Sequence, residues 1–275
     1  EKSLPYFPER LADYAAENIS LKEVLCRPEK FYQQNNVRLI LGKDVNRINF
    51  RKGQLANEEK EIVDYDFLVI AGALERRFPD IKGTNKYGVV DANKLDDVDH
   101  FVKSFPFIDT VILQTQTIKG LKMAEAVRKA KKEVIIVVPA SLSSLSEEIQ
   151  AKFKELETAA VRIIQENAIV EILGDADARA VRLKSGKVFA CEAILFDETV
   201  PYFKLFIDTP LKMNKGIVVD ARLKASIDNV FACGEAAGLP AEQFNEQAGV
   251  IAANILGTHD SPLVTAVLGD SRVSP

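Results

Sequence analysis

Apolar positions along this chain follow two spacings, one typical of amphipathic helices and one of buried strands. Both occur in residues 110–138, which read TVILQTQTIKGLKMAEAVRKAKKEVIIVV. An apolar run at 111–113, helical spacing from 123 to 130 and a second apolar run at 134–138 predict a strand, a helix and a strand. The sequence therefore predicts a β-α-β unit in the middle of the chain.

The remaining residues show the same two spacings in alternation. The expected helices cover residues 8–16, 21–33, 94–103, 145–166 and 241–256. The expected strands cover residues 37–41, 45–50, 67–71, 168–172, 180–183, 188–190, 193–196, 216–219 and 229–233, with a hairpin turn at 184–187. Strands that alternate with helices favour a parallel, three-layer α/β architecture.

Composition narrows the class of protein. The chain has 275 residues, 47% hydrophobic and 28% charged, which suits one large or two medium domains. Its net charge is −4 and it has no long basic run, so we expect no nucleic-acid partner. No apolar stretch approaches the roughly 20 residues of a membrane span, so we expect no membrane partner. Three dispersed cysteines and two histidines predict a cytoplasmic protein without a metal site.

The turn between the first strand and the helix of the central unit lacks expected glycines. A β-α-β unit that binds a dinucleotide needs G-x-G-x-x-G at this point, and the chain has Thr115-Gln116-Thr117-Ile118-Lys119-Gly120. Glycine permits a positive φ and lets the backbone approach a pyrophosphate, and a β-branched threonine does neither well. We expect Gly120 to serve helix packing. The pattern indicates a dinucleotide-type fold with a weak dinucleotide-binding signal.

Several stretches carry a resemblance to a known family, in matching order over nearly the whole chain. They are LPYFPERLADY at 4–14, FYQQNNV at 31–37, LGKDV at 41–45, YDFLVIA at 65–71, NKGIVVD at 214–220, DNVFACGEAA at 228–237 and EQAG at 246–249. They resemble the FAD-dependent pyridine nucleotide-disulfide oxidoreductases, in particular the branch of NADH:rubredoxin reductases and nitrite reductase large subunits.

This resemblance implies an α/β fold with two Rossmann-like, three-layer dinucleotide-binding domains. An FAD-binding-type domain would be split into residues 1–106 and 201–258, around an inserted NAD(P)-binding-type domain at 107–200, with 259–275 as the start of a C-terminal domain or a tail. NAD(P)H would reduce FAD, which would pass electrons to a redox partner protein or a small electron acceptor. Flavin contacts are expected from Val45, Ala71, Gly72, Gly234, Glu235 and Ala236; no catalytic residue is assigned.

The chain departs from the family pattern at its ends and in its flavin segment. No glycine-rich β-α-β unit precedes Glu1, and the residues after 258 match only the first strand of the family's C-terminal domain, so we expect the chain to lie inside a longer protein. The family's G-D after the last flavin-domain strand is Gly234-Glu235 here. The extra methylene of Glu235 moves its carboxylate by about 1.5 Å, which makes a direct hydrogen bond to the flavin ribityl chain less assured.

The nicotinamide segment departs further. The acid expected to contact the ribose falls on Val138 or Pro139, a family glutamate falls on Lys122, and the later G-x-R-P turn reads Glu198-Thr199-Val200-Pro201. Together with Thr115 and Thr117, these changes predict that the domain folds but binds NAD(P)H poorly or not at all.

Two functions of different class follow from these features. The first is an FAD-dependent oxidoreductase of the NAD(P)H:acceptor type with an impaired nicotinamide site. The second is a non-catalytic scaffold or docking subunit of a redox complex that has lost one or both cofactor sites. A homodimer or a subunit of a complex is compatible with both. A binding module for an adenine nucleotide alone is a third interpretation, without positive support.

Overall fold

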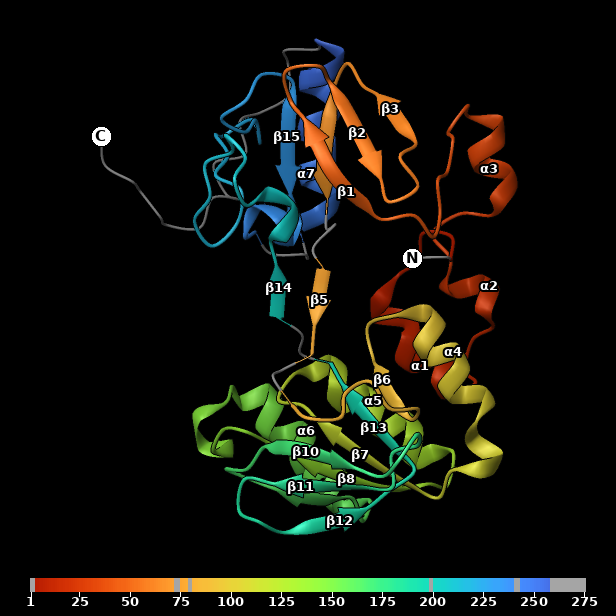
Figure 1. Cartoon of the computed structure of the whole chain (residues 1–275). Helices are drawn as coiled ribbons and strands as arrows, with labels where there is room; N and C mark the ends of the chain where they lie inside the picture. The colour runs from red at the N-terminus through yellow and green to blue at the C-terminus, as the bar shows by residue number, and fades with distance from the viewer. Residues whose placement is uncertain (1–2, 72–74, 79–80, 198–199, 240–242, 258–275) are drawn as a thin grey trace. The chain divides into compact units, whose positions relative to one another are not determined.

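The computed structural model describes residues 3–71, 75–78, 81–197, 200–239 and 243–257 (Figure 1). The chain divides into two compact units. Unit 1 contains Glu1–Gly42 and Arg77–Val200, and unit 2 contains Lys43–Arg76 and Pro201–Pro275. The expected FAD-type and NAD(P)-type domains are defined by the cofactor that each would bind, and that division stays a prediction. The compact units have different bounds, because residues 1–42 and 77–106 pack with residues 107–200.

Unit 1 is built on a five-stranded parallel sheet, and the predicted α/β fold class is confirmed. Its strand order is β6 (Val89–Asp91), β13 (Ala193–Phe196), β7 (Thr110–Gln114), β8 (Glu133–Val137) and β9 (Arg162–Ile164). The three central strands are buried at nearly every position, because layers cover both faces of the sheet. The predicted β-α-β unit is confirmed as β7, helix α5 (Ile118–Lys129) and β8.

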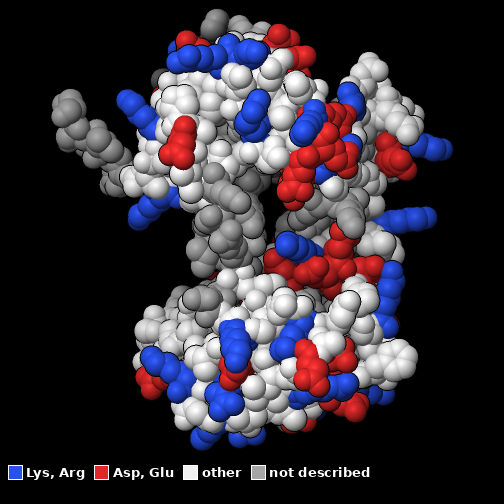
Figure 2. All heavy atoms as spheres, in the orientation of Figure 1, with Lys and Arg blue, Asp and Glu red and all other residues white. Residues whose placement is uncertain are grey.

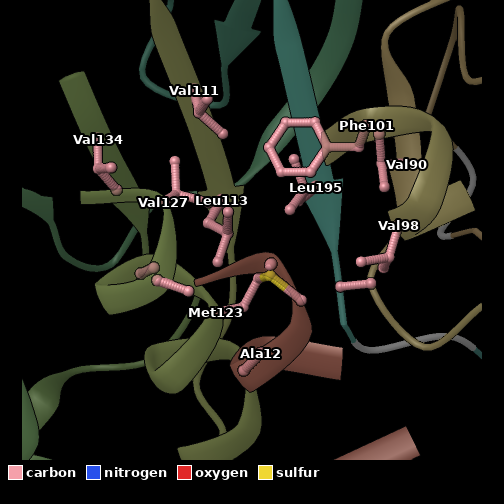
Figure 3. Packing of buried hydrophobic residues seen from close by; sticks show 14 of the residues in the cluster. Ala12, Val90, Val98, Phe101, Val111, Leu113, Met123, Val127, Val134 and Leu195 are labelled. Atoms are coloured by element: carbon pink, nitrogen blue, oxygen red, sulfur yellow. The ribbon is translucent and has the colours of Figure 1, made fainter. Parts of the chain in front are cut away.

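Successive residues of this sheet face two different cores. Val111 and Leu113 of β7 face the helices, where they pack near Met123 of α5 and Ala12 of the N-terminal helix (Figure 3). Ile112 faces the opposite core, under a three-stranded antiparallel sheet. The helices of unit 1 are η1 (Pro8–Arg10), α1 (Leu11–Ala15), α2 (Leu21–Val24), α3 (Glu29–Gln34), α4 (Leu95–Lys103), η2 (Phe105–Phe107), α5, η3 (Leu142–Ser144) and α6 (Glu147–Thr158). The antiparallel strands are β10 (Ile169–Leu173), β11 (Ala180–Leu183) and β12 (Val188–Ala190), and the predicted hairpin between β11 and β12 is confirmed.

Unit 2 contains two small sheets. One is antiparallel, with β1 (Val45–Asn49), β2 (Gln54–Asn57) and β3 (Ile62–Asp64) in that order. The other pairs β15 (Val230–Cys233) in parallel with β4 (Leu68–Ala71). The helical elements are η4 (Lys204–Phe206), η5 (Gly234–Ala237) and α7 (Phe244–Leu256), and β5 (Glu75–Arg77) pairs with β14 (Val200–Tyr202) where the chain passes from one unit to the other.

Two predicted helices are wrong in extent. Residues 21–33 form two short helices, α2 and α3, separated at Pro28, because a proline disfavours the helical conformation of the residue before it. The helix expected over 145–166 ends at Thr158. Ala160 has a left-handed φ of 60°, and the chain then enters β9, which pairs in parallel with β8. Tertiary pairing of the apolar residues after 160 outweighs their helical spacing.

Two predicted strands are absent from the described residues. Residues 37–41 are irregular, and Val37, Ile40 and Leu41 are exposed. Residues 216–219 make only the isolated bridges Met213↔Ile217 and Val219↔Ala225. Apolar residues in these segments lack a neighbouring strand with which to form a ladder.

The surface is mixed in charge and the helices are short. None of the helices that the structure describes has both the length and the apolar character to cross a bilayer. On the face shown in Figure 2, basic and acidic side chains are interspersed. Opposite charges also pair within unit 1, where Lys152 of α6 forms ion pairs with Glu125 of α5 at 2.7 Å and with Glu155 at 2.9 Å.

Candidate functional site

The loop that joins β7 to α5 carries the first group of candidate residues. β7 ends at Gln114, and Thr117 has extended backbone angles and is the N-cap of α5. The Thr117 hydroxyl accepts a hydrogen bond from the Gly120 N–H at 3.1 Å, which satisfies one amide of the first helical turn. The Thr115 hydroxyl in the same way accepts from the Thr117 N–H at 3.1 Å. The two threonines that replace glycines therefore fold back onto their own backbone.

Both hydroxyl groups donate their protons to one carboxyl oxygen. Thr115 Oγ1 donates to Asp197 Oδ2 at 2.8 Å, and Thr117 Oγ1 donates to the same oxygen. Asp197 directly follows β13, whose residue Phe196 is in register with Gln114 of β7. Because adjacent parallel strands end at the same edge of the sheet, Asp197 lies beside the β7–α5 loop.

The Asp197 side chain is buried and incompletely hydrogen-bonded. The residue is 5% exposed, and its Oδ1 atom has no hydrogen-bond partner among the described residues. Burial raises the pKa of this carboxyl group, while the two threonine hydroxyls and the positive charge of Lys119 act in the opposite direction. Asp197 is therefore a buried acid at the start of α5, and the two threonine hydroxyls hold it through its Oδ2 atom.

Gly120 permits the close packing of this group. A Cβ atom at this position would lie 2.0 Å from Thr115 Oγ1 and 2.3 Å from Asp197 Oδ2. The expectation that Gly120 serves helix packing is confirmed, since any side chain there would overlap the threonine and the carboxyl group.

A second set of polar residues supports Asp197 from the neighbouring strand. Asn93, which follows β6, donates from Nδ2 to the Asp197 carbonyl oxygen at 2.7 Å. The Asn93 N–H in turn donates to Asp91 Oδ1 at 2.9 Å, and the Asp91 N–H donates to Asp97 Oδ2 at 3.1 Å. Sequence reasoning missed both Asp197 and Asn93. The signal available was their position directly after apolar strand segments, where functional residues of parallel sheets gather.

The other nicotinamide-type positions lie apart from this cluster. Val138, where an acid was expected, is fully buried, and Pro139 beside it is exposed. Lys122 is exposed on α5. Glu198 and Thr199 lie outside the described residues.

The expected flavin contacts fall mainly on one edge of unit 2. Ala71 ends β4 and is in register with Cys233, which ends β15, so Ala71 lies beside the start of Gly234, Glu235 and Ala236. Ala71 and Glu235 are exposed and Ala236 is buried. Val45 begins β1, in the other sheet of the unit, and Gly72 lies outside the described residues. The role of these six residues stays a prediction.

Helix α7 holds the Gly234 turn in place. Gly234 has a left-handed φ of 56°, which favours glycine, and a Cβ there would lie 2.3 Å from the Phe244 ring. Its N–H donates to Gln247 Oε1 at 2.6 Å, and Gln247 is fully buried. Sequence reasoning assigned no role to Gln247, although it lies in the EQAG stretch that carries the family resemblance and is a polar residue in the middle of an apolar helix.

The three cysteines are free thiols, and two of them lie in the cores. Burial raises the pKa of Cys233, and it raises the pKa of Cys191 to about 12. Neither buried thiol is therefore a thiolate nucleophile at neutral pH.

The parallel sheet, its β-α-β unit and the polar edge define a dinucleotide-binding type of α/β protein. Residues 6–253 match the family described as pyridine nucleotide-disulphide oxidoreductase, and the chain belongs to that family. The resemblance seen in the sequence is thereby confirmed, and FAD and NAD(P)H, the expected cofactors, are those of its members.

Individual relatives are distant. Rhodocoxin reductase from Rhodococcus erythropolis is 25% identical over 247 residues, covering 87% of this chain and 58% of that protein. An assimilatory nitrate reductase electron transfer subunit from Bacillus subtilis (strain 168) is 23% identical, covering 86% of this chain and 32% of the relative. Among solved structures, NADH:rubredoxin oxidoreductase from Clostridium acetobutylicum has a TM-score of 0.75 at 19% identity, covering 94% of this chain and 67% of the other. The chain thus spans less than two thirds of the length of each of these two curated relatives, and the structural likeness shows the fold.

Proposed function

We propose that this chain forms part of an FAD-dependent oxidoreductase of the NAD(P)H:acceptor type. Family membership supports an electron-transfer role, and so do relatives named as a rhodocoxin reductase and as an electron transfer subunit of nitrate reductase. The acceptor would be a redox partner protein or a small molecule. FAD, when bound, supplies the redox chemistry, and the protein supplies its orientation and electrostatic environment.

The edge formed by the ends of β4 and β15 is the place in unit 2 that suits the flavin. Ligands of parallel α/β sheets bind outside the carboxyl ends of the strands. Ala71 and Glu235 are exposed at this edge, so a ligand can approach it through them, while the buried Gly234 N–H donates to Gln247. Val45, Gly72 and Ala236 complete the proposed set of contacts.

We infer further that residues 114–120 bind NAD(P)H weakly or not at all. The observation that carries this inference is the use of the Thr117 and Gly120 amides, which donate to threonine hydroxyls. A dinucleotide loop needs such amides at the helix start to hold its pyrophosphate. As arranged, the loop does not fit that group, and buried Val138 offers no acceptor to a ribose.

The same loop favours a second candidate function. A chain that keeps the fold but closes its dinucleotide loop would suit a scaffold or docking subunit of a redox complex. In that case one or both cofactor sites would have been given up, while the surfaces that meet partners would remain.

Two measurements on the purified protein separate these functions. After incubation with FAD and dialysis, absorption bands near ~370 and ~450 nm support the flavoprotein, and their absence from a folded protein supports the scaffold. Titration with NADH should give no saturation below about 100 μM, and a dissociation constant of about 1–10 μM would contradict the closed nicotinamide loop.

A further inference from the structure

The start of α5 already has an acidic group in the position that an anion would take. Helix N-termini attract anions because the first amides lack partners and the helix dipole is positive there. In this chain the Thr117 and Gly120 amides pass their hydrogen bonds through two threonine hydroxyls to Asp197 Oδ2. The donors of the turn therefore converge on one internal carboxyl group.

The space around that carboxyl group is filled. Asp197 is 5% exposed and Thr115 is fully buried. The missing Cβ of Gly120 would lie 2.3 Å from Asp197 Oδ2, so the helix, the threonine and the carboxyl group are in direct contact. A diphosphate could reach the first turn only after the carboxyl group had moved away.

The Asp197 carboxyl group also comes from outside the loop that it closes. It is contributed by the end of β13, 82 residues from Thr115 in sequence. Its backbone is fixed separately, since the Asp197 carbonyl oxygen accepts from Asn93 Nδ2 at 2.7 Å. The Asp197 side chain is therefore held by the β7–α5 loop and its backbone by Asn93, and its Oδ1 atom is buried without a partner among the described residues.

We propose that Asp197 is the residue that excludes dinucleotide phosphate from this domain, by occupying the helix start as an internal substitute for the anion. This inference rests on the proposed weakness of NAD(P)H binding and assigns its cause. The bulk of Thr115 and Thr117 alone is then insufficient to explain the closure, because the threonines serve mainly to hold the carboxyl group.

The test compares variants of the whole protein that differ in volume at the loop. In the double variant Thr115→Gly/Asp197→Ala, the carboxyl group and one hydroxyl are removed, and Thr117 remains as the N-cap. In the matched control Thr115→Val/Asp197→Asn, the hydrogen bonds of the Thr115 hydroxyl and the carboxyl charge are removed, an amide oxygen can still accept from Thr117, and the side-chain volumes are kept. Each protein is titrated with NADH by calorimetry in the presence of saturating FAD, so that the flavin-type domain does not take up the probe.

We expect the Gly/Ala variant to bind NADH at least about tenfold more tightly than the unaltered protein, with the Val/Asn control unchanged. No gain in a folded Gly/Ala variant, or an equal gain in the single variant Thr115→Gly, would overturn the role of Asp197. Circular dichroism establishes folding, and Asp197→Ala alone, which retains both threonine caps, replaces the double variant if that protein does not fold. Tight binding by the unaltered protein is a separate result that refutes the proposed weakness of NAD(P)H binding.

Discussion

Two turns of this chain follow buried parallel strands, and they differ in what meets the backbone. After β7 the loop at 115–117 is filled from within by Asp197, which comes from the neighbouring strand. After β15, helix α7 packs against the turn at Gly234–Ala237, with a hydrogen bond to Gln247 and a contact with the Phe244 ring. Glu235, the acid of the second turn, is exposed, whereas Asp197 is buried.

The difference shows how one kind of edge can be kept open or closed without a change of fold. At the Gly234 turn the acidic residue, Glu235, is exposed, and the Gly234 N–H donates to Gln247 of α7. At the Thr115 loop the Asp197 carboxyl group accepts from the two threonine hydroxyls, which in turn accept from the Thr117 and Gly120 amides that a phosphate would need. We therefore propose the Gly234 turn as the ligand-binding one and the Thr115 loop as the structurally filled one, and each of the following changes tests this contrast.

The largest effect is expected for Gly120→Ala. The new Cβ would lie 2.0 Å from Thr115 Oγ1, so the helix or the Asp197 cluster must shift, at a cost of about 2–3 kcal/mol in the free energy of unfolding. Gly249→Ala in α7 is the matched control, since a Cβ added there would meet nothing within 4 Å among the described residues. This change should raise the free energy of unfolding by up to about 1 kcal/mol. Urea denaturation of both variants checks this, and equal values for the two would show that the α5 start is loosely packed.

Local apolar spacing predicts some elements of this chain and leaves others undetermined. The strands at 111–113 and 134–138 and the helix between them are predictable because a buried parallel unit shows in local apolar spacing alone. The end of α6 at Thr158 is not, because residues 162–164 become a strand only through pairing with β8.

The sequence alone predicted the altered residues of the Thr115 loop but not the carboxyl group that fills it. The absence of glycines at 115 and 117 is visible directly, and it predicted impaired binding on steric grounds. Asp197 is 82 residues distant, and its place beside Thr115 depends on β13 pairing with β7, an order that apolar spacing does not determine. The hydrogen bond from the Gly234 N–H to Gln247 cannot be predicted from the sequence for the same reason, since it depends on how α7 packs.

The second largest effect is expected for Gln247→Leu. This change leaves the buried Gly234 N–H without its acceptor at 2.6 Å, which should lower the free energy of unfolding by about 1–3 kcal/mol. Measured at about pH 4, where a buried glutamic acid is neutral, Gln247→Glu keeps an acceptor oxygen at the same place and should lose less. If chemical denaturation finds the two variants alike, the bond from Gln247 does not hold the turn.

A smaller, pH-dependent effect is expected for Asp197→Asn. Burial raises the folded-state pKa of Asp197, so its contribution to stability is complete below the ordinary value of 3.8 and is lost as the pH rises through the folded-state value. Asparagine does not titrate, so the unaltered protein should lose stability relative to the variant as the pH rises above 3.8. Thermal unfolding of both proteins from acid to neutral pH measures the difference, and a difference that stays constant with pH would mean that Asp197 titrates normally.

The smallest effect on stability is expected for Glu235→Asp. Glu235 is exposed, so shortening its side chain should change the free energy of unfolding by less than about 0.5 kcal/mol. The change moves the carboxylate closer to the backbone of the turn, by about 1.5 Å, which is enough to make or break a hydrogen bond to a ligand. If the Gly234 turn is the open one, FAD affinity measured by absorption titration should rise severalfold while stability stays the same. An unchanged affinity would place the flavin away from Glu235, and the contrast between the two turns would then rest on the Thr115 loop alone.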